Sequence, residues 1–128
     1  MIKEKLKLEY LLQSTSKNVI WDAISSSNGL ERWFADSVVI SNRHVTFSWG
    51  NSEVREAEII AIRTQQFIRF HWLDDEEKRS YFEMRMSCNE MTGKYTLTIT
   101  DFADSDDLDM QHDLWDTQIE ELMRKTGL

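Results

Sequence analysis

Proline is absent from this 128-residue chain, which also contains only four glycines and a single cysteine, Cys88. No P-loop, G-x-G-x-x-G or G-x-S-x-G sequence occurs, so the common nucleotide-binding and hydrolase motifs are excluded. A lone cysteine excludes a disulfide within the chain and fits a reducing compartment. No apolar run approaches the roughly 20 residues of a membrane helix, and the first residues, MIKEKLKLEYLL, do not form a signal-peptide pattern. We therefore expect a soluble, cytoplasmic protein.

Metal-ligand spacing is also missing. His44, His71 and His112 lie in different expected elements, without H-x-x-x-H or C-x-x-C spacing. The acidic run DSDDLD lacks the turn glycine and distal Glu of a calcium loop, and its place before a predicted helix favours stabilisation of the helix dipole. We expect no metal and no cofactor.

The negative charge is concentrated in the last part of the chain. The net charge is −8, of which residues 101–128 supply nine acids against Arg124 and Lys125. An acidic segment without a compensating basic, aromatic stripe argues against nucleic-acid binding. Hydrophobic residues make up 41% of the chain, so its length suits one domain, residues 1–128, with a sizeable core.

Alternation of apolar and polar residues predicts seven strands. Residues 4–12 place Leu6, Leu8, Tyr10 and Leu12 on one face. Six further strands, joined by short links, are expected in the ranges 37–41, 44–49, 53–64, 67–72, 80–88 and 94–102. Consecutive strands with short links predict an antiparallel meander with one packed face.

Helical spacing marks three other segments. VIWDAI at 19–24 predicts a helix that ends at the Ser-Ser-Ser-Asn-Gly run, and LERWF at 30–34 predicts a second, short one. Residues 106–126 predict a long amphipathic helix whose apolar stripe includes Leu108, His112, Trp115 and Ile119. The order is therefore a strand, two short helices, six strands and a long helix.

This order and the local text resemble START-like proteins (the Bet v/SRPBCC superfamily), especially the chaperone-activator-like branch (activators of heat-shock-protein ATPase). The resemblance lies in Val19 and Trp21 of the first helix, the Leu-x-x-Trp-Phe string ending at Phe34, and LWDTQIEELM near the end. It implies an α+β helix-grip fold, in which a curved antiparallel sheet of about seven strands holds the last helix. Leu30, Trp33 and Phe34 would then either fill the core or form a wall of a ligand cavity at the concave side.

The inward-facing residues define a candidate cavity for a small apolar molecule such as a lipid, an isoprenoid or an aromatic compound. Aromatic and Met side chains with few polar anchors are typical of such pockets. The expected lining residues are Trp33, Phe34, Phe47, Trp49, Phe70, Trp72, Phe82, Met84, Met86, Tyr95, Leu97, His112, Trp115 and Ile119.

Three functions stay open at this point. The first is a non-catalytic binding module for an apolar ligand, and the second, implied by the resemblance, is a protein-interaction module with a protein partner or a second copy. The third is an enzyme related to cyclases or dehydratases, which would need His112 with Asp101 or Tyr95 as an acid–base pair. No catalytic motif supports the third. Asp101 has inward parity, but we expect it at the end of the sheet, in water or near an Arg, because a buried unpaired carboxylate is costly.

Overall fold

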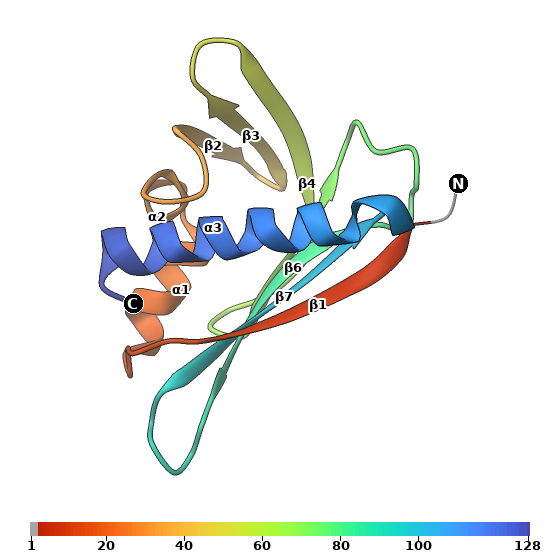
Figure 1. Cartoon of the computed structure of the whole chain (residues 1–128). Helices are drawn as coiled ribbons and strands as arrows, with labels where there is room; N and C mark the ends of the chain where they lie inside the picture. Colours follow the sequence, from red (N-terminus) through yellow and green to blue (C-terminus); the bar gives the residue numbers. More distant parts are fainter. Residues whose placement is uncertain (1–2) are drawn as a thin grey trace.

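The computed structural model describes residues 3–128 and confirms the α+β helix-grip architecture (Figure 1). A seven-stranded antiparallel sheet curves around a long C-terminal helix. The elements in chain order are β1 (Glu4–Leu11), α1 (Lys17–Ser25), α2 (Ser27–Glu31), β2 (Ser37–Ser41), β3 (His44–Trp49), β4 (Glu53–Arg63), β5 (Phe67–Trp72), β6 (Phe82–Cys88), β7 (Tyr95–Ala103), a 3₁₀ turn (Ser105–Asp107) and α3 (Leu108–Thr126).

Strands β2 to β7 form a meander, and β1 pairs with β7 to form one edge of the sheet. Its order is β1-β7-β6-β5-β4-β3-β2, and every pair is antiparallel. Leu8 pairs with Ile99 and Tyr10 with Leu97, so the inward face of β1 continues the inward face of β7. The alternation in the sequence therefore predicted the packed face correctly.

A register shift in β4 helps the sheet curve. The pairing of β4 with β5 slips between Ile59 and Ala61, as at a β-bulge, which bends a strand and increases its twist. The Arg43 side chain donates a hydrogen bond of 2.9 Å to the Ile59 carbonyl at this point. Figure 1 shows β2, β3 and part of β4 on one side of α3, with β1, β6 and β7 on the other.

Helix α3 lies across the concave face and buries Trp115, Ile119 and Leu122. It begins two residues later than predicted, because Ser105–Asp107 form the 3₁₀ turn. Acidic residues occupy its first turn and Arg124 and Lys125 its last, which suits the helix dipole. Gly127 ends it in the left-handed conformation, with φ of 77°.

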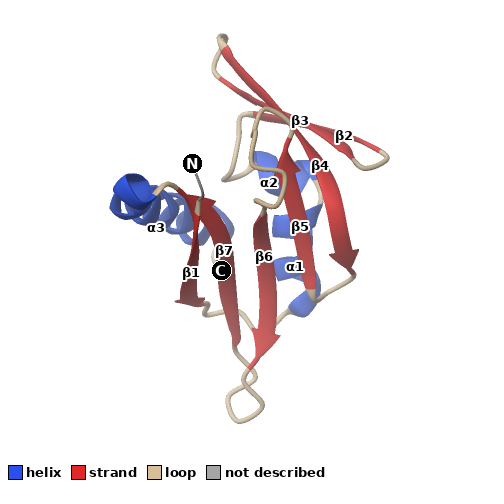
Figure 2. Cartoon of the chain, turned by 90° about the vertical axis from the view of Figure 1, so that its right-hand side faces the viewer, coloured by secondary structure: helices blue, strands red, loops and turns tan. Residues whose placement is uncertain are grey.

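Helices α1 and α2 meet closely, behind β4, β5 and β6 in Figure 2. The Ser26 side chain accepts a hydrogen bond of 2.8 Å from the Gly29 amide and so caps α2. A Cβ atom at Gly29 would lie 1.9 Å from the Asp22 carbonyl oxygen, so only glycine fits here. The Trp33 Nε1–H donates a hydrogen bond of 2.8 Å to the Ala23 carbonyl and holds the end of α2 against α1.

Phe34, the next residue, projects into an aromatic cluster at the centre of the molecule. Its ring centroid lies 5.1–6.1 Å from those of the surrounding rings. These rings belong to Phe47, Trp49, Phe82 and Trp115. Trp33 therefore fixes the helix pair, whereas Phe34 connects the two helices to the sheet and to α3.

Candidate ligand-binding site

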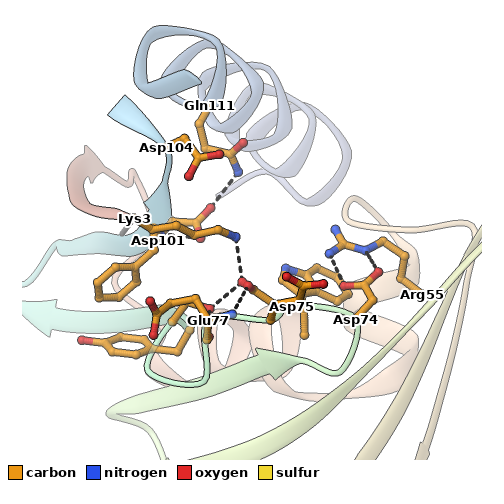
Figure 3. Close-up of a pocket in the computed structure, with 13 residues that line it drawn as sticks. Lys3, Arg55, Asp74, Asp75, Glu77, Asp101, Asp104 and Gln111 are labelled. Atoms are coloured by element: carbon orange, nitrogen blue, oxygen red, sulfur yellow. Dashed lines mark hydrogen bonds and ion pairs between the residues drawn. The ribbon is translucent and has the colours of Figure 1, made fainter. Parts of the chain in front are cut away.

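Two adjoining pockets open where the ends of β4 and β5 face the first half of α3. The first is largely apolar and has a volume of about 310 Å³. The second is polar and has a volume of about 560 Å³ (Figure 3). Four residues, Arg55, Trp72, Asp101 and Gln111, line both. The pockets are therefore two parts of one cleft.

Aromatic residues supply five of the eleven residues that line the apolar pocket. The ring of Trp72 stacks on Phe82 with centroids 4.9 Å apart, and Phe82 lies 6.1 Å from Trp115. Polar side chains supply the rest of the wall, apart from Leu114. The full lining is Phe34, Trp49, Glu53, Arg55, Trp72, Phe82, Asp101, Gln111, Leu114, Trp115 and Gln118.

Asp101 lies where the two pockets meet and is 7% exposed. Its Oδ2 accepts hydrogen bonds from Trp115 Nε1 at 2.8 Å and Gln111 Nε2 at 2.7 Å, and its Oδ1 accepts one from the Phe102 amide at 2.8 Å. Burial raises the pKa of Asp101 above its ordinary value, and these hydrogen bonds oppose the rise. The expectation that Asp101 lies in water or near an Arg is wrong, because α3 supplies neutral donors that satisfy the buried carboxylate.

The polar pocket is held together by Asp75, in the loop between β5 and β6. Its Oδ2 accepts a hydrogen bond of 2.8 Å from Lys3 Nζ and another from the Ser80 hydroxyl, while Oδ1 accepts one from the Glu77 amide (Figure 3). Burial alone would raise the pKa of Asp75, but these donors lower it below the ordinary value. The contacts tie the start of β1 to a loop more than 70 residues away in sequence.

Arg55 lines both pockets and is one of several lining residues, with Gln111 and Gln118, that the sequence analysis missed. Its Nε and a terminal nitrogen donate hydrogen bonds of 3.0 and 2.8 Å to the two carboxylate oxygens of Asp74. Its guanidinium carbon also lies 3.9 Å from the centroid of the Trp72 ring, in a cation–π contact. The sequence did contain a sign that Arg55 is unusual. Arg55 has the same strand parity as the inward-facing Ala57 and Ile59, and a charged residue at an inward position of a strand is uncommon.

A family model, described as the START-like superfamily domain, matches residues 1–128. The chain belongs to the START-like superfamily. The resemblance of the sequence to START-like proteins is thereby confirmed at the level of the superfamily. A search of curated proteins found no match.

Solved structures with the START-like fold include one of high sequence identity. BfR322 from Bacteroides fragilis, known from a solution NMR structure, is 58% identical over 97% of this chain and 91% of that chain, with a TM-score of 0.70. The Aha1 dimer from Colwellia psychrerythraea has a TM-score of 0.79 at 10% identity, with 96% of each chain covered. CalU16 from Micromonospora echinospora has a TM-score of 0.72 at 15% identity, with 94% of this chain and 72% of that chain covered. At the two lower identities, the likeness shows the shared START-like fold.

Five of the residues predicted to line a cavity line the apolar pocket of this START-like domain. They are Phe34, Trp49, Trp72, Phe82 and Trp115. Other predicted residues pack in the core instead: Trp33 and Met86 are buried, and the side chains of Phe47, Phe70, Met84, Leu97 and Ile119 are at most 1% exposed. Tyr95 is half-buried at the beginning of β7, where it pairs with Cys88.

His112 does not face the sheet, and that prediction is wrong. Its side chain is 49% exposed, and Nε2 lies 3.5 Å from Oδ1 of Asp116, one turn further along α3. Asp116 in turn accepts a hydrogen bond of 2.7 Å from the Tyr10 hydroxyl on β1. Because β1 is the edge of the sheet, no further strand in residues 3–128 covers this side of the helix. The side chains that α3 directs to Asp101 are Gln111 and Trp115.

Residues 3–128 contain no group of three or more His, Cys, Asp or Glu side chains placed to hold a metal ion. The same residues contain no helix that is both long and apolar enough to span a membrane. Every buried side-chain nitrogen or oxygen described in the structure has a hydrogen-bond partner.

Proposed function

We propose that this START-like protein is a binding module for a small, largely apolar molecule held between the sheet and α3. The observation that carries the proposal is the apolar pocket of about 310 Å³, walled by aromatic rings from α3, β3, β5 and β6 and by Phe34, which follows α2. Small-molecule sites commonly have such walls, with a few polar groups that orient the ligand. Here Glu53, Arg55, Gln111 and Gln118 supply the polar groups at the rim.

The packing around the pocket supports a pre-formed site. Trp49 Nε1 donates a hydrogen bond of 2.8 Å to the Phe34 carbonyl, and Trp115 Nε1 is held by Asp101. Both indoles therefore line the pocket with their polar atoms already satisfied by the protein. A ligand would not need to order these rings on binding, which reduces the entropic cost.

The enzyme alternative loses its acid–base pair in this geometry. His112 contacts Asp116, and the partners of the Asp101 carboxylate are Trp115, Gln111 and the Phe102 amide. Tyr95 lies at the opposite end of β7 from Asp101. The pairs suggested by the sequence therefore do not converge on one position, and binding without chemistry is the better-supported function.

A fluorescence titration tests the proposal. An environment-sensitive apolar naphthalene dye should bind the native protein with saturation at one site and quench the tryptophan emission. Gln118→Trp should reduce the affinity at least tenfold, because Gln118 lines the pocket and the larger ring would fill it. Glu120→Trp places the same ring on the exposed side of α3 and serves as the matched control. Equal affinities for the two variants, or no saturable binding, would refute the proposal.

Protein interaction is a second candidate function, supported by exposed apolar side chains on α3. Met110 and Leu114 are 65% and 50% exposed and lie one turn apart. The neighbour from Colwellia psychrerythraea, which shares the fold, is described as a dimer. Sedimentation velocity at increasing protein concentration tests self-association through this face. A dimer that Met110→Asp dissociates would support it, and a monomer at every concentration would not.

A further inference from the structure

The two parts of the cleft differ sharply in charge. The wall of the polar pocket contains six carboxylates, from Asp74, Asp75, Glu76, Glu77, Asp101 and Asp104, against the two cations Lys3 and Arg55. The apolar part opens directly into this acidic part, because Arg55, Trp72, Asp101 and Gln111 line both. A molecule with its apolar body against the aromatic rings would therefore extend its other end among carboxylates.

The two cations of the cleft are already neutralised by the protein. Lys3 pairs with Asp75 at 2.8 Å, and Arg55 pairs with Asp74 at 2.8 Å. Within residues 3–128, Glu76, Glu77 and Asp104 have no cationic side chain within ion-pair distance. An anionic ligand would thus meet uncompensated negative charge, whereas a cationic ligand would meet free carboxylate acceptors.

Arg55 shows how this cleft surrounds a cation of the protein itself. Its guanidinium lies over the Trp72 ring at 3.9 Å and is held by both oxygens of Asp74. An aromatic face together with a carboxylate is the combination that recognises organic cations. Trp72 lines both pockets, but Arg55 already occupies this combination, so a ligand cation would meet the carboxylates that lack a cationic partner.

We infer that the cleft takes an amphipathic organic cation, with a flat apolar body among the aromatic rings and an ammonium or guanidinium group in the acidic pocket. The inference rests on the proposed binding function and adds the charge of the ligand to it. The carboxylates of Glu76, Glu77 and Asp104, which line the polar pocket, supply the attraction for the cationic group.

Three naphthalene probes of nearly equal size separate charge from apolar fit. They are the amine 2-(1-naphthyl)ethylamine, which is cationic at neutral pH, the neutral alcohol 2-(1-naphthyl)ethanol, and the anion 1-naphthaleneacetate. Each is titrated into the full chain at low ionic strength, and binding is followed by the shifts of the tryptophan indole N–H signals. The cation should bind about tenfold more tightly than the alcohol and the anion more weakly than both. Added salt should reduce this preference, since the carboxylates are near solvent.

A pair of variants locates the source of the preference. Glu76→Gln combined with Asp104→Asn removes two carboxylates without a cationic partner and should lower cation affinity about three- to tenfold, with alcohol affinity unchanged. Asp113→Asn combined with Glu120→Gln makes the same charge change at exposed positions of α3 outside the cleft and is the control. The control should change cation affinity less than twofold.

The outcomes distinguish this inference from the proposed function. Equal binding of the three probes, or tighter binding of the anion, would overturn the inference while the binding function stands. Equal effects of the two double variants would also overturn it, because the preference would then come from net charge alone. Saturable binding of none of the probes would overturn both.

Discussion

Trp115 Nε1 lies 2.8 Å from Oδ2 of Asp101, and this hydrogen bond joins the centre of α3 to the end of β7. Trp115 is 3% exposed and Asp101 is 7% exposed, so the contact is closed to water. The carboxylate therefore determines the orientation of an indole that forms part of the pocket wall. This one pair of side chains therefore affects how α3 docks, how the Asp101 carboxylate is satisfied and how the cleft is shaped.

Replacing the indole tests the strength of that hydrogen bond. Trp115→Phe keeps an aromatic ring but removes one donor to a buried carboxylate, which should cost about 1–3 kcal/mol of unfolding free energy at pH 7. Trp33→Phe is the matched control, because Trp33 Nε1 donates to the neutral carbonyl of Ala23 and its loss should cost only about 0.5–1.5 kcal/mol. Chemical denaturation measures both. A Trp115→Phe cost that does not fall when Asp101 is protonated at low pH would contradict the assignment.

The pH dependence of stability reports on Asp101 directly. Burial raises its folded-state pKa above the ordinary value of 3.8, so the folded protein holds this proton more tightly than the unfolded chain. The contribution of Asp101 to stability is therefore largest at low pH and decreases as pH rises through the folded-state pKa. Asp101→Asn does not titrate. We expect the unfolding free energy of the native protein, relative to this variant, to decrease as pH rises above the ordinary value of 3.8. A pH-independent difference between the two proteins would rule out the raised pKa.

Glu83 should show the opposite sign. It is 5% exposed on the convex face of the sheet and accepts hydrogen bonds from Arg69 at 2.8 Å and Arg85 at 3.2 Å. Burial raises its pKa, but the two guanidinium groups outweigh burial and lower it below the ordinary value of 4.5. The stabilisation is thus present above pH 4.5 and is lost as pH falls through the lower folded-state pKa.

Glu83→Gln should therefore cost about 1–3 kcal/mol at pH 7, and the cost should shrink in acid. Glu121→Gln removes a carboxylate that is also paired with two cations, Arg124 and Lys125, but on the surface, and should cost clearly less than Glu83→Gln. Denaturant titrations of both variants at neutral and acidic pH provide the comparison. A similar cost for both would show that burial of the Glu83 pair adds nothing.

Core and pocket positions should respond differently to truncation. Met84 is fully buried on β6, so Met84→Ala should cost about 2–5 kcal/mol by leaving a cavity. Leu114 is 50% exposed at the pocket, so Leu114→Ala should cost less than about 0.5 kcal/mol but weaken binding of an apolar probe. Leu11→Ala, at a position 76% exposed on β1, controls for loss of an exposed leucine. Weaker probe binding in both exposed variants would argue against the pocket.

Gly29→Ala tests the contact between α1 and α2. Alanine favours a helix over glycine, but its Cβ would lie 1.9 Å from the Asp22 carbonyl oxygen, so the backbones would have to separate. We expect Gly29→Ala to lower the unfolding free energy by about 1–3 kcal/mol. Asn28→Ala changes the neighbouring exposed position of the same helix and should stay within about 0.5 kcal/mol. Thermal unfolding of the two variants measures the difference. A Gly29→Ala variant more stable than the native protein would contradict the close contact between α1 and α2.

Most of the elements were predictable from local patterns, but the second helix, predicted at 30–34, is α2 at Ser27–Glu31. All seven strands and both longer helices were found within about two residues of their ends, because alternation and helical spacing directly record which side chains are buried. The same argument failed for His112. Its spacing correctly aligns it with Ile119, but spacing does not show that the sheet ends at β1 beside the helix.

Asp101 shows the same limit of sequence periodicity, here for a residue whose inward direction was predicted correctly. Its parity indicated an inward position, and the structure keeps it there. What parity did not show is that Gln111 and Trp115, ten and fourteen residues further on, would supply its donors. A strand pattern describes the strand alone, whereas the cost of burying a carboxylate depends on what packs against it.

The sequence by itself determined the order of elements, the inward face of each strand and the family to which the chain belongs. Only the tertiary structure decided which inward residues fill the core and which line a cleft. It also brought Lys3 to Asp75 and Arg55 to Asp74 and Trp72, contacts between segments that are distant along the chain. The physical reason is that periodicity records the direction of a side chain relative to its own backbone. The space left between two packed elements depends instead on sheet curvature and on where the helix docks.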